Sequence, residues 1–287
     1  ETGARWVRTD WTWNETRNWE LISWAHNSSI KVLGILDHQT MNFSQNFTLT
    51  DWVNEVNKTV GRYPKIDAWE IWNEPNIPPY FGFMNGEPLN YTQMLSNANQ
   101  IIKKETNSSV IFGGVSTSSS DWEEWLRKCY ALGAANFCDY QGLHTYKDDS
   151  NDNIRDVIRA REITGKQIWV TEIGCPSWPP WLSPFYTEEG QAYYLKENFK
   201  KLNNIRDICR LIFWYEFIDS RPMDSSSDKE NYFGLIRADM TKKPSFYVFL
   251  SFTSPYDQFF LIISVFLLTL ATILIILIKL LRKHQIW

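Results

Sequence analysis

Short apolar segments alternate with amphipathic segments along most of the chain, and this alternation constrains the fold more than any other feature of the sequence. The apolar segments are rich in Trp, Ile, Val and Phe, which is typical of β-strands, whereas the segments between them have the apolar spacing of helices. Strands that alternate with helices predict βαβ units and a parallel sheet. We predict strands over residues 4–10, 30–37, 66–72, 109–115, 137–144, 167–174 and 209–217, and helices over 16–27, 49–63, 91–105, 121–132, 152–163, 188–203 and 243–252.

The predicted fold class is α/β, a (β/α)8 TIM barrel whose first βα unit is missing from this sequence. The predicted strands and helices form one unit fewer than the eight of such a barrel. Since the chain opens almost directly on a strand, we expect that unit upstream of Glu1, so that the sequence is truncated at its N-terminus. An open doubly wound sheet is the alternative, but it does not explain where the acidic residues fall.

An uncharged apolar run lies near the C-terminus, over residues 259–278. At 1.5 Å per residue a helix of this length spans roughly 30 Å, the thickness of one bilayer core. Lys279, Arg282 and Lys283 follow the run, which favours a cytoplasmic C-terminus and an outward-facing main domain. We expect a barrel domain over residues 1–253, a juxtamembrane linker over 254–258, a transmembrane helix over 259–281 and a short basic cytoplasmic tail over 282–287.

Two further features agree with a single-pass protein at the cell surface. Seven N-x-S/T triplets predict a glycoprotein. Four cysteines allow disulfides between Cys129 and Cys138 and between Cys175 and Cys209, although free buried thiols are also possible. The triplets begin at Asn14, Asn27, Asn42, Asn46, Asn57, Asn90 and Asn107.

Composition excludes several partners. A net charge of -4 gives no reason to expect nucleic acid. No phosphate-binding loop and no clustered Cys or His spacing appear, so no cofactor and no metal are expected. The oligomeric state stays open. The chain contains 15 Trp, 13 Tyr and 17 Phe, a content that suits core packing and also a sugar-binding cleft.

Two glutamates stand at the C-terminal ends of predicted strands, where barrel active sites are built. They are Glu74 in "WNEP" and Glu172 in "TEIG". If side chains alternate strictly, Ala68, Glu70, Trp72 and Glu74 point into the barrel, as do Ile168, Val170 and Glu172, whereas Trp169 and Thr171 point outward.

A facing pair of carboxylates suits glycoside hydrolysis. One carboxyl group protonates the leaving oxygen, and the other attacks the anomeric carbon or activates water. A separation of about 5 to 5.5 Å predicts retention of configuration. Either glutamate alone is more simply an exposed loop residue or an ion-pair partner, but the two strand ends together favour catalysis.

The segments "VRTDWTW", "VLGILDHQ", "WEIWNEPN", "GLHTY", "WVTEIG" and "LIFWYEF" resemble, in order, the motifs of clan A glycoside hydrolases. The closing "NYFGLIRADMTKKPSFYVF" resembles the ending of such enzymes. The resemblance covers about residues 4–252, and families 5 and 39, which include cellulases, mannanases and β-xylosidases, are nearest. It implies a retaining (β/α)8 enzyme that acts on a carbohydrate substrate.

The resemblance implies Glu74 as general acid/base and Glu172 as nucleophile. It also implies that Asn73 forms a hydrogen bond with the sugar 2-hydroxyl. Arg8 is implied to hold the nucleophile ionised, because a nearby cation favours a charged carboxylate. Glu74 needs a raised pKa to donate a proton at neutral pH, and we expect the negative charge of Glu172 to supply it.

Other candidates follow later strands. The resemblance places His144 near the acid/base and Tyr146 against the nucleophile, although His144 could equally cap a loop. Trp214 resembles the aromatic floor of the sugar site, with core packing as the alternative. His38 and Asp37 are candidates for sugar contacts. We expect Glu70 to be a buried structural carboxylate that pairs with an arginine. Trp178 and Trp181 are expected on an aromatic rim of the site.

The sequence therefore predicts a membrane-anchored, retaining β-glycoside hydrolase that cleaves β-linked oligo- or polysaccharides through two glutamates. A transglycosylase would use the same residues, because water access to the intermediate decides between the two outcomes. A catalytically silent sugar-binding surface protein is the alternative from another class. The intact set Asn73, Glu74 and Glu172 counts against it.

Overall fold

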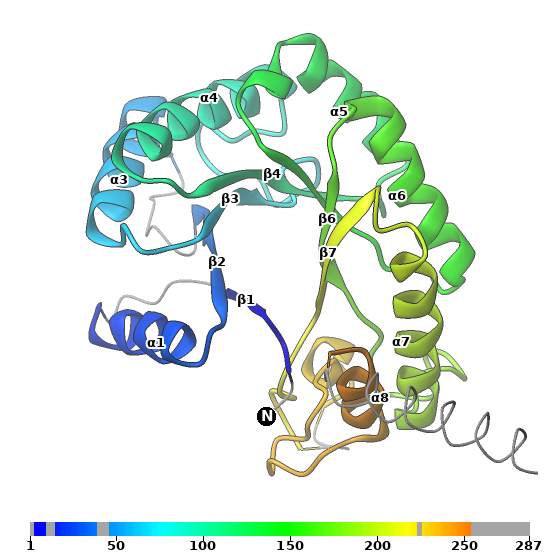
Figure 1. Ribbon diagram of the computed structural model, residues 1–287. Helices are drawn as coiled ribbons and strands as arrows, with labels where there is room; N and C mark the ends of the chain where they lie inside the picture. The colour runs from blue at the N-terminus through cyan, green and yellow to red at the C-terminus, as the bar shows by residue number, and fades with distance from the viewer. Residues whose placement is uncertain (1–2, 10–14, 39–45, 223–225, 254–287) are drawn as a thin grey trace, which may run out of the picture.

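The computed structural model describes residues 3–9, 15–38, 46–222 and 226–253, and the statements below concern these residues. They form one parallel sheet of seven strands in chain order, with helices around its outer surface (Figure 1). The strands are β1 (Trp6–Thr9), β2 (Lys31–Leu36), β3 (Ala68–Asn73), β4 (Ser109–Ser116), β5 (Tyr140–His144), β6 (Ile168–Ile173) and β7 (Cys209–Trp214). The α-helices are α1 (Glu15–Asn27), α3 (Leu49–Arg62), α4 (Pro88–Glu105), α5 (Trp122–Ala131), α6 (Ser150–Thr164), α7 (Glu188–Asn203) and α8 (Pro244–Thr253).

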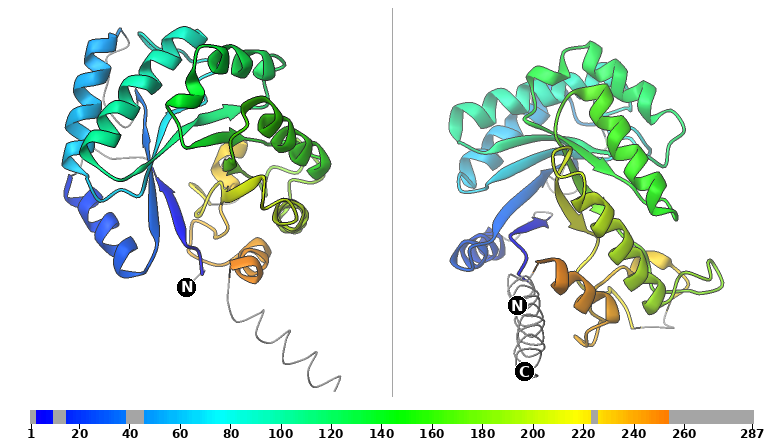
Figure 2. Two further views of the ribbon diagram at one scale, coloured as in Figure 1. Left: turned by 45° about the horizontal axis from the view of Figure 1, so that its top comes forward. Right: turned by 45° about the vertical axis from the view of Figure 1, so that its right-hand side comes forward.

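The predicted alternation of strands and helices is confirmed in every unit. The sheet curls until β1 and β7 approach one another, so the architecture is a nearly closed α/β barrel (Figure 2). Within the described residues the ladder runs from β1 to β7 without a pairing between these two strands. The βα unit that we expected upstream of Glu1 is not part of this sequence, and its existence stays a prediction.

Local sequence explains where helix α3 begins and which face it buries. The side chain of Thr48 accepts from the backbone N–H of Asp51, and Asp51 accepts from the backbone N–H of Thr48 at 2.8 Å, which is a capping box. Trp52, Val56 and Val60 follow at four-residue spacing and are buried. Because residues four apart share one face of a helix, this stripe packs α3 against the sheet.

Two apolar layers surround the strands. The larger layer fills the space between the strands and the helices and contains most of the buried side chains. The smaller layer lies inside the barrel and draws one side chain from nearly every strand, which packs the lumen below the cavity described next. Its buried members are Leu33, Ala68, Ile111, Trp169 and Phe213.

The predicted alternation on β6 is wrong. Trp169 lies in the inner layer, and the hydroxyl of Thr171 donates to buried Glu70 at 2.8 Å. Ile168 and Val170 instead pack toward the helices. The strand phase is therefore opposite to the one that a strict alternation back from Glu172 predicts.

A bulge nevertheless turns Glu172 toward the mouth of the barrel. The pairing of β5 with β6 passes from Leu143 opposite Val170 directly to His144 opposite Glu172. One residue of β6 is thus extra, and an extra residue reverses the side of the sheet that the next side chain faces. Strict alternation placed this glutamate correctly for the wrong reason.

All four cysteines are free buried thiols, so neither of the disulfides considered above is present. Cys129 and Cys138 pack in the outer apolar layer, and burial raises the pKa of Cys138 to about 11. Cys175 and Cys209 likewise pack in the outer layer. These residues act as small apolar side chains.

Among the described residues, no helix has both the length and the apolar character that a bilayer crossing requires. The predicted linker, transmembrane helix and basic tail, residues 254–287, lie outside the described residues.

Candidate active site

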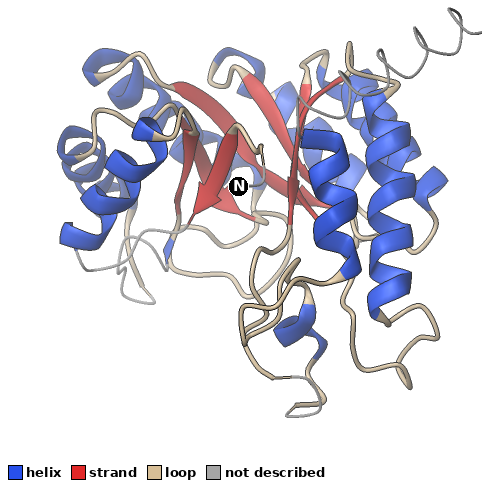
Figure 3. Cartoon of the chain, turned by 60° about the horizontal axis from the view of Figure 1, so that its bottom comes forward, coloured by secondary structure: helices blue, strands red, loops and turns tan. Residues whose placement is uncertain are grey.

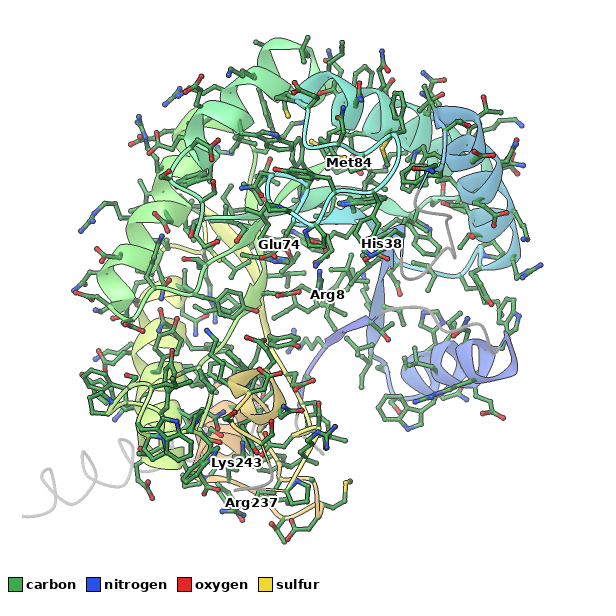
Figure 4. All side chains as sticks on the ribbon, turned by 180° about the vertical axis from the view of Figure 1, so that it is seen from behind. Arg8, His38, Glu74, Met84, Arg237 and Lys243 are labelled. Atoms are coloured by element: carbon green, nitrogen blue, oxygen red, sulfur yellow. The ribbon has the colours of Figure 1, made fainter. Side chains whose placement is uncertain are left out.

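A cavity of about 450 Å³ opens where the strands end and the loops that follow them extend beyond the sheet (Figure 3). Arg8 of β1, Asn73 and Glu74 at the end of β3, and Glu172 of β6 line it. Arg8 and Glu74 lie near the centre of the ring of strands (Figure 4). The loops after β5, β6 and β7 contribute Tyr146, Asp148, Cys175, Pro176, Tyr186, Tyr215, Lys229, Glu230 and Phe233.

Arg8 holds three polar side chains in place. Its Nε donates to Glu70 Oε2 at 2.5 Å, its Nη1 to Glu172 Oε1 at 2.6 Å and its Nη2 to Asn73 Oδ1 at 2.9 Å. The predicted contact between Arg8 and Glu172 is therefore present. Asn73 lines the cavity beside them, and its contact with a sugar hydroxyl stays a prediction.

Glu70 is the buried structural carboxylate that the sequence predicted. Its side chain has 0% exposure and pairs with Arg8. Burial alone would raise its pKa, but the charge of Arg8 and the hydrogen bond and charge of His144 outweigh burial and lower it to about 2. Glu70 is thus an anion that fixes Arg8 from below.

His144 lies between the carboxylates and is fully buried. Its Nδ1 lies 3.1 Å from Glu74 Oε1 and 3.4 Å from Glu172 Oε2, and its Nε2 lies 3.8 Å from Glu70 Oε1. Burial would lower the pKa of the imidazole, but Glu172, Glu70 and Glu74 together raise it to about 9. His144 is therefore a cation at neutral pH, and the predicted proximity to Glu74 is confirmed.

Tyr146 donates its hydroxyl to Glu172 Oε2 at 2.6 Å, as predicted. Burial and the charge of Glu172 raise the pKa of Tyr146 well above its usual range, so the phenol keeps its proton. Glu172 thus receives hydrogen bonds from Arg8 on one oxygen and from Tyr146 on the other, so that both of its oxygens are held in place.

The prediction of a raised pKa for Glu74 is wrong for this arrangement. Burial acts to raise the pKa, but the hydrogen bond and the charge of His144 outweigh it, so the net direction is downward. The prediction counted the negative charge of Glu172 and omitted a protonated imidazole 3.1 Å away. Both His144 and the hydroxyl of Ser116 hydrogen-bond to Glu74.

The chain is strained where β3 ends. Trp72 and Glu74 have φ angles of 71° and 47°, in the left-handed region that side chains other than glycine rarely adopt. The ring of Trp72 is turned outward, where its centroid lies 5.8 Å from that of Phe47 and 6.0 Å from that of Trp52. The prediction that Trp72 faces the lumen is therefore wrong, and both Asn73 and Glu74 face the cavity instead.

Asn76 holds this strained turn against the neighbouring strand. Its Nδ2 donates to the carbonyl oxygen of Ser116, and its Oδ1 accepts from the backbone N–H of Ser116, both at 2.9 Å. Ser116 ends β4, and its hydroxyl lowers the pKa of Glu74 further. The "WNEPN" segment therefore combines a cavity-facing Asn-Glu pair with the amide that anchors it.

Gly114 makes room for His144. A Cβ atom at this position would lie 2.0 Å from His144 Nε2, which no side chain could tolerate without displacing the imidazole. The backbone N–H of Gly114 also donates to Glu70 Oε1 at 2.9 Å. The glycine thus lets β4 approach the group of charges closely.

Trp214 does not form the floor of the cavity. Its ring lies 6.3 Å from Tyr194 and 6.4 Å from Phe199 on α7, and its Nε1 donates to the carbonyl oxygen of Phe233 at 3.1 Å. Core packing, the alternative, is correct. Tyr215, the residue that directly follows β7, lines the cavity instead.

His38 also lies away from the cavity. Its ring stacks on Phe81 with a centroid distance of 3.7 Å, whereas Asp37 beside it is among the lining residues. Burial lowers the pKa of His38. A sugar contact from Asp37 remains a prediction, and one from His38 has no support in the geometry.

The loop after β6 contains the expected aromatic pair. The rings of Trp178 and Trp181 meet edge to face with centroids 5.0 Å apart, and Trp181 is 65% exposed. Cys175 and Pro176 line the cavity at the start of the same loop. A rim for bound sugar stays a prediction.

Sequence reasoning missed the residues on the cavity wall. Asp148 and Tyr186 lie in irregular segments after strands, and Lys229 and Glu230 begin a short 3-10 helix, Lys229–Tyr232. None of these segments is long enough for a periodic pattern to show which way a side chain faces. Only their position after predicted strands could have indicated them.

Comparisons with known proteins agree with this architecture. A family model described as glycosyl hydrolase catalytic core matches residues 3–236. No curated protein matches the sequence.

Solved structures share the fold at low identity. A family 39 glycoside hydrolase from the gut symbiont Bacteroides cellulosilyticus WH2 has a TM-score of 0.66 at 20% identity, over 88% of this chain and 58% of that chain. Fungal β-1,4-galactanases give 0.67 at 15% identity, over 87% of this chain and 88% of that chain. Bacteroides uniformis β-glucuronidase gives 0.66 at 16% identity, over 88% of this chain and 31% of that chain.

This chain thus spans 58% of the length of the first of these proteins and 31% of the last. Likeness at such identities shows the fold, while the family model covers most of the sequence. The chain belongs to the glycosyl hydrolase catalytic core family.

Proposed function

We propose that this protein is a retaining β-glycoside hydrolase in which Glu172 is the nucleophile and Glu74 the general acid/base. The observation that carries the proposal is that both carboxylates approach the same atom, His144 Nδ1, at 3.1 and 3.4 Å. Because both oxygens lie this close to one atom, Glu74 Oε1 and Glu172 Oε2 cannot be farther apart than the sum of these two distances. This limit favours the narrow spacing of about 5 to 5.5 Å, typical of retaining enzymes, over the range of about 6.5 to 9.5 Å that inverting enzymes need.

The surroundings of the two glutamates support the division of roles. Arg8 and Tyr146 donate to the two oxygens of Glu172 and so orient this carboxylate for attack on the anomeric carbon. Glu74 receives its hydrogen bond from His144, a cation that carries a transferable proton. Transfer of that proton from Nδ1 to Glu74 Oε1 leaves a neutral imidazole and a carboxylic acid, which then protonates the leaving oxygen.

The same contacts prepare the second step. When the sugar is bonded to Glu172, the negative charge of that carboxylate disappears. Because Glu172 is one of the groups that raise the pKa of His144, its neutralisation favours the neutral imidazole that the first step leaves. Glu74, now ionised, takes a proton from the water that attacks the glycosyl-enzyme, and the bond between the sugar and Glu172 breaks. The released charge of Glu172 again raises the pKa of His144, and the proton returns from Glu74 Oε1 to His144 Nδ1, which restores the starting state.

Two variants test the assignment on aryl β-glycosides. We expect Glu172→Ala to abolish turnover and added azide to restore it with an α-glycosyl azide as product. A β-glycosyl azide would reverse the two roles. We expect Glu74→Gln to spare the first step for substrates with good leaving groups and to stall it for poor ones; equal losses on both would exclude an acid role. Product analysis in the same assays separates hydrolysis from transglycosylation.

We further propose that the protein is anchored in a membrane by residues 259–278, with the cavity facing away from the bilayer. Phe252, near the end of α8, lies 5.7 Å from Phe199 near the end of α7 by ring centroids. Both helices therefore end on the side of the barrel opposite the cavity. Fractionation of cells after alkaline carbonate washing tests this: we expect the full chain in the membrane pellet, and its release into the supernatant would contradict anchoring.

The proposal of a glycoprotein is supported at four of the seven sites. Asn27, Asn46, Asn57 and Asn107 are exposed. Asn90 differs, because its Nδ2 donates to the carbonyl oxygen of Phe83 at 3.0 Å. We expect mass spectrometry of the native protein to find glycans at exposed sites and an unmodified Asn90; unmodified peptides at all of them would contradict the proposal.

A further inference from the structure

Carboxylates outnumber cations in the lining of the cavity. Among the residues that the structure describes, the lining includes five acidic and two basic side chains. Such a cavity presents a negative potential to an entering molecule, and low-dielectric walls strengthen that potential. The acidic residues are Asp37, Glu74, Asp148, Glu172 and Glu230, and the basic residues are Arg8 and Lys229.

Arg8 offers little to an anionic substrate. Its Nε, Nη1 and Nη2 already donate to Glu70, Glu172 and Asn73. Two of these partners are carboxylates at 2.5 and 2.6 Å, so the positive charge of the guanidinium is already neutralised. A sugar carboxylate that approached Arg8 would meet Glu172 first.

Lys229 lies within an acidic segment. Asp228 precedes it and Glu230 follows it. Burial raises the pKa of Glu230, Lys229 lowers it, and the charges of Asp228, Glu172 and Glu74 raise it again, so that the net direction is upward. The sequence thus sets one lysine between two carboxylates in this segment, and Glu230 lines the cavity beside Lys229.

Asp148 adds an acidic side chain from the loop after β5. Within the described part of the chain, no ion pair joins Asp148 or Glu230 to a lysine or arginine. After burial, the charge of Asp148 is the next cause that raises the pKa of the Cys175 thiol and of the Tyr186 phenol. Both groups belong to the loop after β6, so the charge of Asp148, in the loop after β5, acts on that neighbouring loop as well.

We infer that the cavity selects sugars that carry no negative charge, and that Asp148 and Glu230 exclude uronic acids and sulfated sugars. The inference rests on the proposed glycosidase function and names its substrate class. The fold does not decide this point, because similar structures include both β-1,4-galactanases and a β-glucuronidase. A like charge brought into a partly desolvated site is strongly disfavoured, whereas a hydroxymethyl group is not.

The test compares aryl β-glycosides that differ only at C6: glucoside with glucuronide, and galactoside with galacturonide. We expect kcat/KM of the wild-type protein to be at least tenfold higher for the neutral member of a pair. In the double variant Asp148→Asn/Glu230→Gln this ratio should fall at least tenfold, mainly through KM of the uronide. Equal rates within each pair for the wild type, or an unchanged ratio in the double variant, would overturn the inference.

Glu105→Gln/Asp207→Asn is the matched control. It removes the same two negative charges from exposed residues at the other end of the barrel, before β4 and before β7, and should leave the ratio unchanged. If no aryl glycoside is turned over, the proposed function fails. Calorimetry with methyl β-glucoside and methyl β-glucuronide then tests the inference alone: tighter binding of the neutral sugar supports it, and equal binding, tighter uronide binding or no binding of either overturns it.

Discussion

The guanidinium of Arg8 and the carboxylate of Glu172 meet across the barrel, from β1 and β6, with Nη1 2.6 Å from Oε1. The same guanidinium holds fully buried Glu70 at 2.5 Å, so one side chain fixes both a structural and a cavity-lining carboxylate. The position of the proposed nucleophile thus depends on a residue at the edge of the sheet.

Removal of Arg8 should damage folding as well as activity. Arg8→Met removes the ion-pair partner 2.5 Å from Glu70 and leaves the more distant His144 at 3.8 Å, and loss of one partner of a buried pair costs about 3 to 5 kcal/mol. We expect chemical denaturation to show a loss of this size. The double variant Arg8→Met/Glu70→Gln should recover part of it, because the uncompensated buried charge is gone. Additive losses in the two single variants would contradict the pairing.

Stability should depend on pH through His144. Its folded-state pKa of about 9 lies above the ordinary value of 6.5, so the stabilising contribution is complete below about pH 6.5 and is lost as the pH rises through 9. Glu172, Glu70 and Glu74 raise this pKa, whereas burial and Arg8 oppose them. Denaturation curves between pH 6 and 10 should show a decline on the order of 3 kcal/mol. A similar decline in His144→Gln would show that another group causes it.

Gly114→Ala should impair catalysis by displacing His144, since the new Cβ would lie 2.0 Å from Nε2. Misplacement of a catalytic array by about 1 Å can cost roughly 10²-fold in rate, and we expect kcat to fall by at least that factor. Gly61→Ala is the control. No atom lies within 4 Å of its new Cβ in helix α3, so stability should stay equal or rise slightly. Full activity in Gly114→Ala would contradict the close approach.

Neighbouring aromatic residues at the end of β7 should respond differently to substitution. Trp214→Phe alters packing against α7, so we expect a loss of about 1 to 2 kcal/mol in stability with little change in KM. Tyr215→Ala removes a wall of the cavity and should raise KM roughly tenfold, equivalent to about 1.4 kcal/mol. The opposite pattern would restore Trp214 as the floor of the sugar site. Thermal unfolding and steady-state kinetics give both quantities.

The sequence was sufficient to predict the barrel units and the glutamate pair. Apolar periodicity identifies the strands and the helices. The glutamate pair is visible because Glu74 and Glu172 each stand at the C-terminal end of a strand. Strict alternation failed at Trp72 and on β6, because a positive φ and a bulge each reverse the side on which the next residue lies. The prediction for the end of β7 was also wrong by one residue, because Tyr215 lines the cavity and Trp214 does not.

Charges supplied by distant segments were harder to predict. His144 reverses the expected direction of the pKa of Glu74, and its own ionisation depends on carboxylates from β3 and β6. On the cavity wall, Asp148 lies in a loop and Glu230 in the short 3-10 helix Lys229–Tyr232, and neither segment has a repeating sequence pattern. Such features become visible only when the strands bring these segments together.

The central claim is that Glu172 bonds covalently to the sugar while Glu74 transfers protons. The most direct measurement is mass spectrometry after incubation with a 2-deoxy-2-fluoro β-glycosyl fluoride of the best substrate, followed by peptide mapping. We predict one added glycosyl unit on the peptide that contains Glu172, and none in Glu172→Ala. A label on Glu74, or turnover that yields the inverted anomer by NMR without any labelled peptide, would contradict the mechanism.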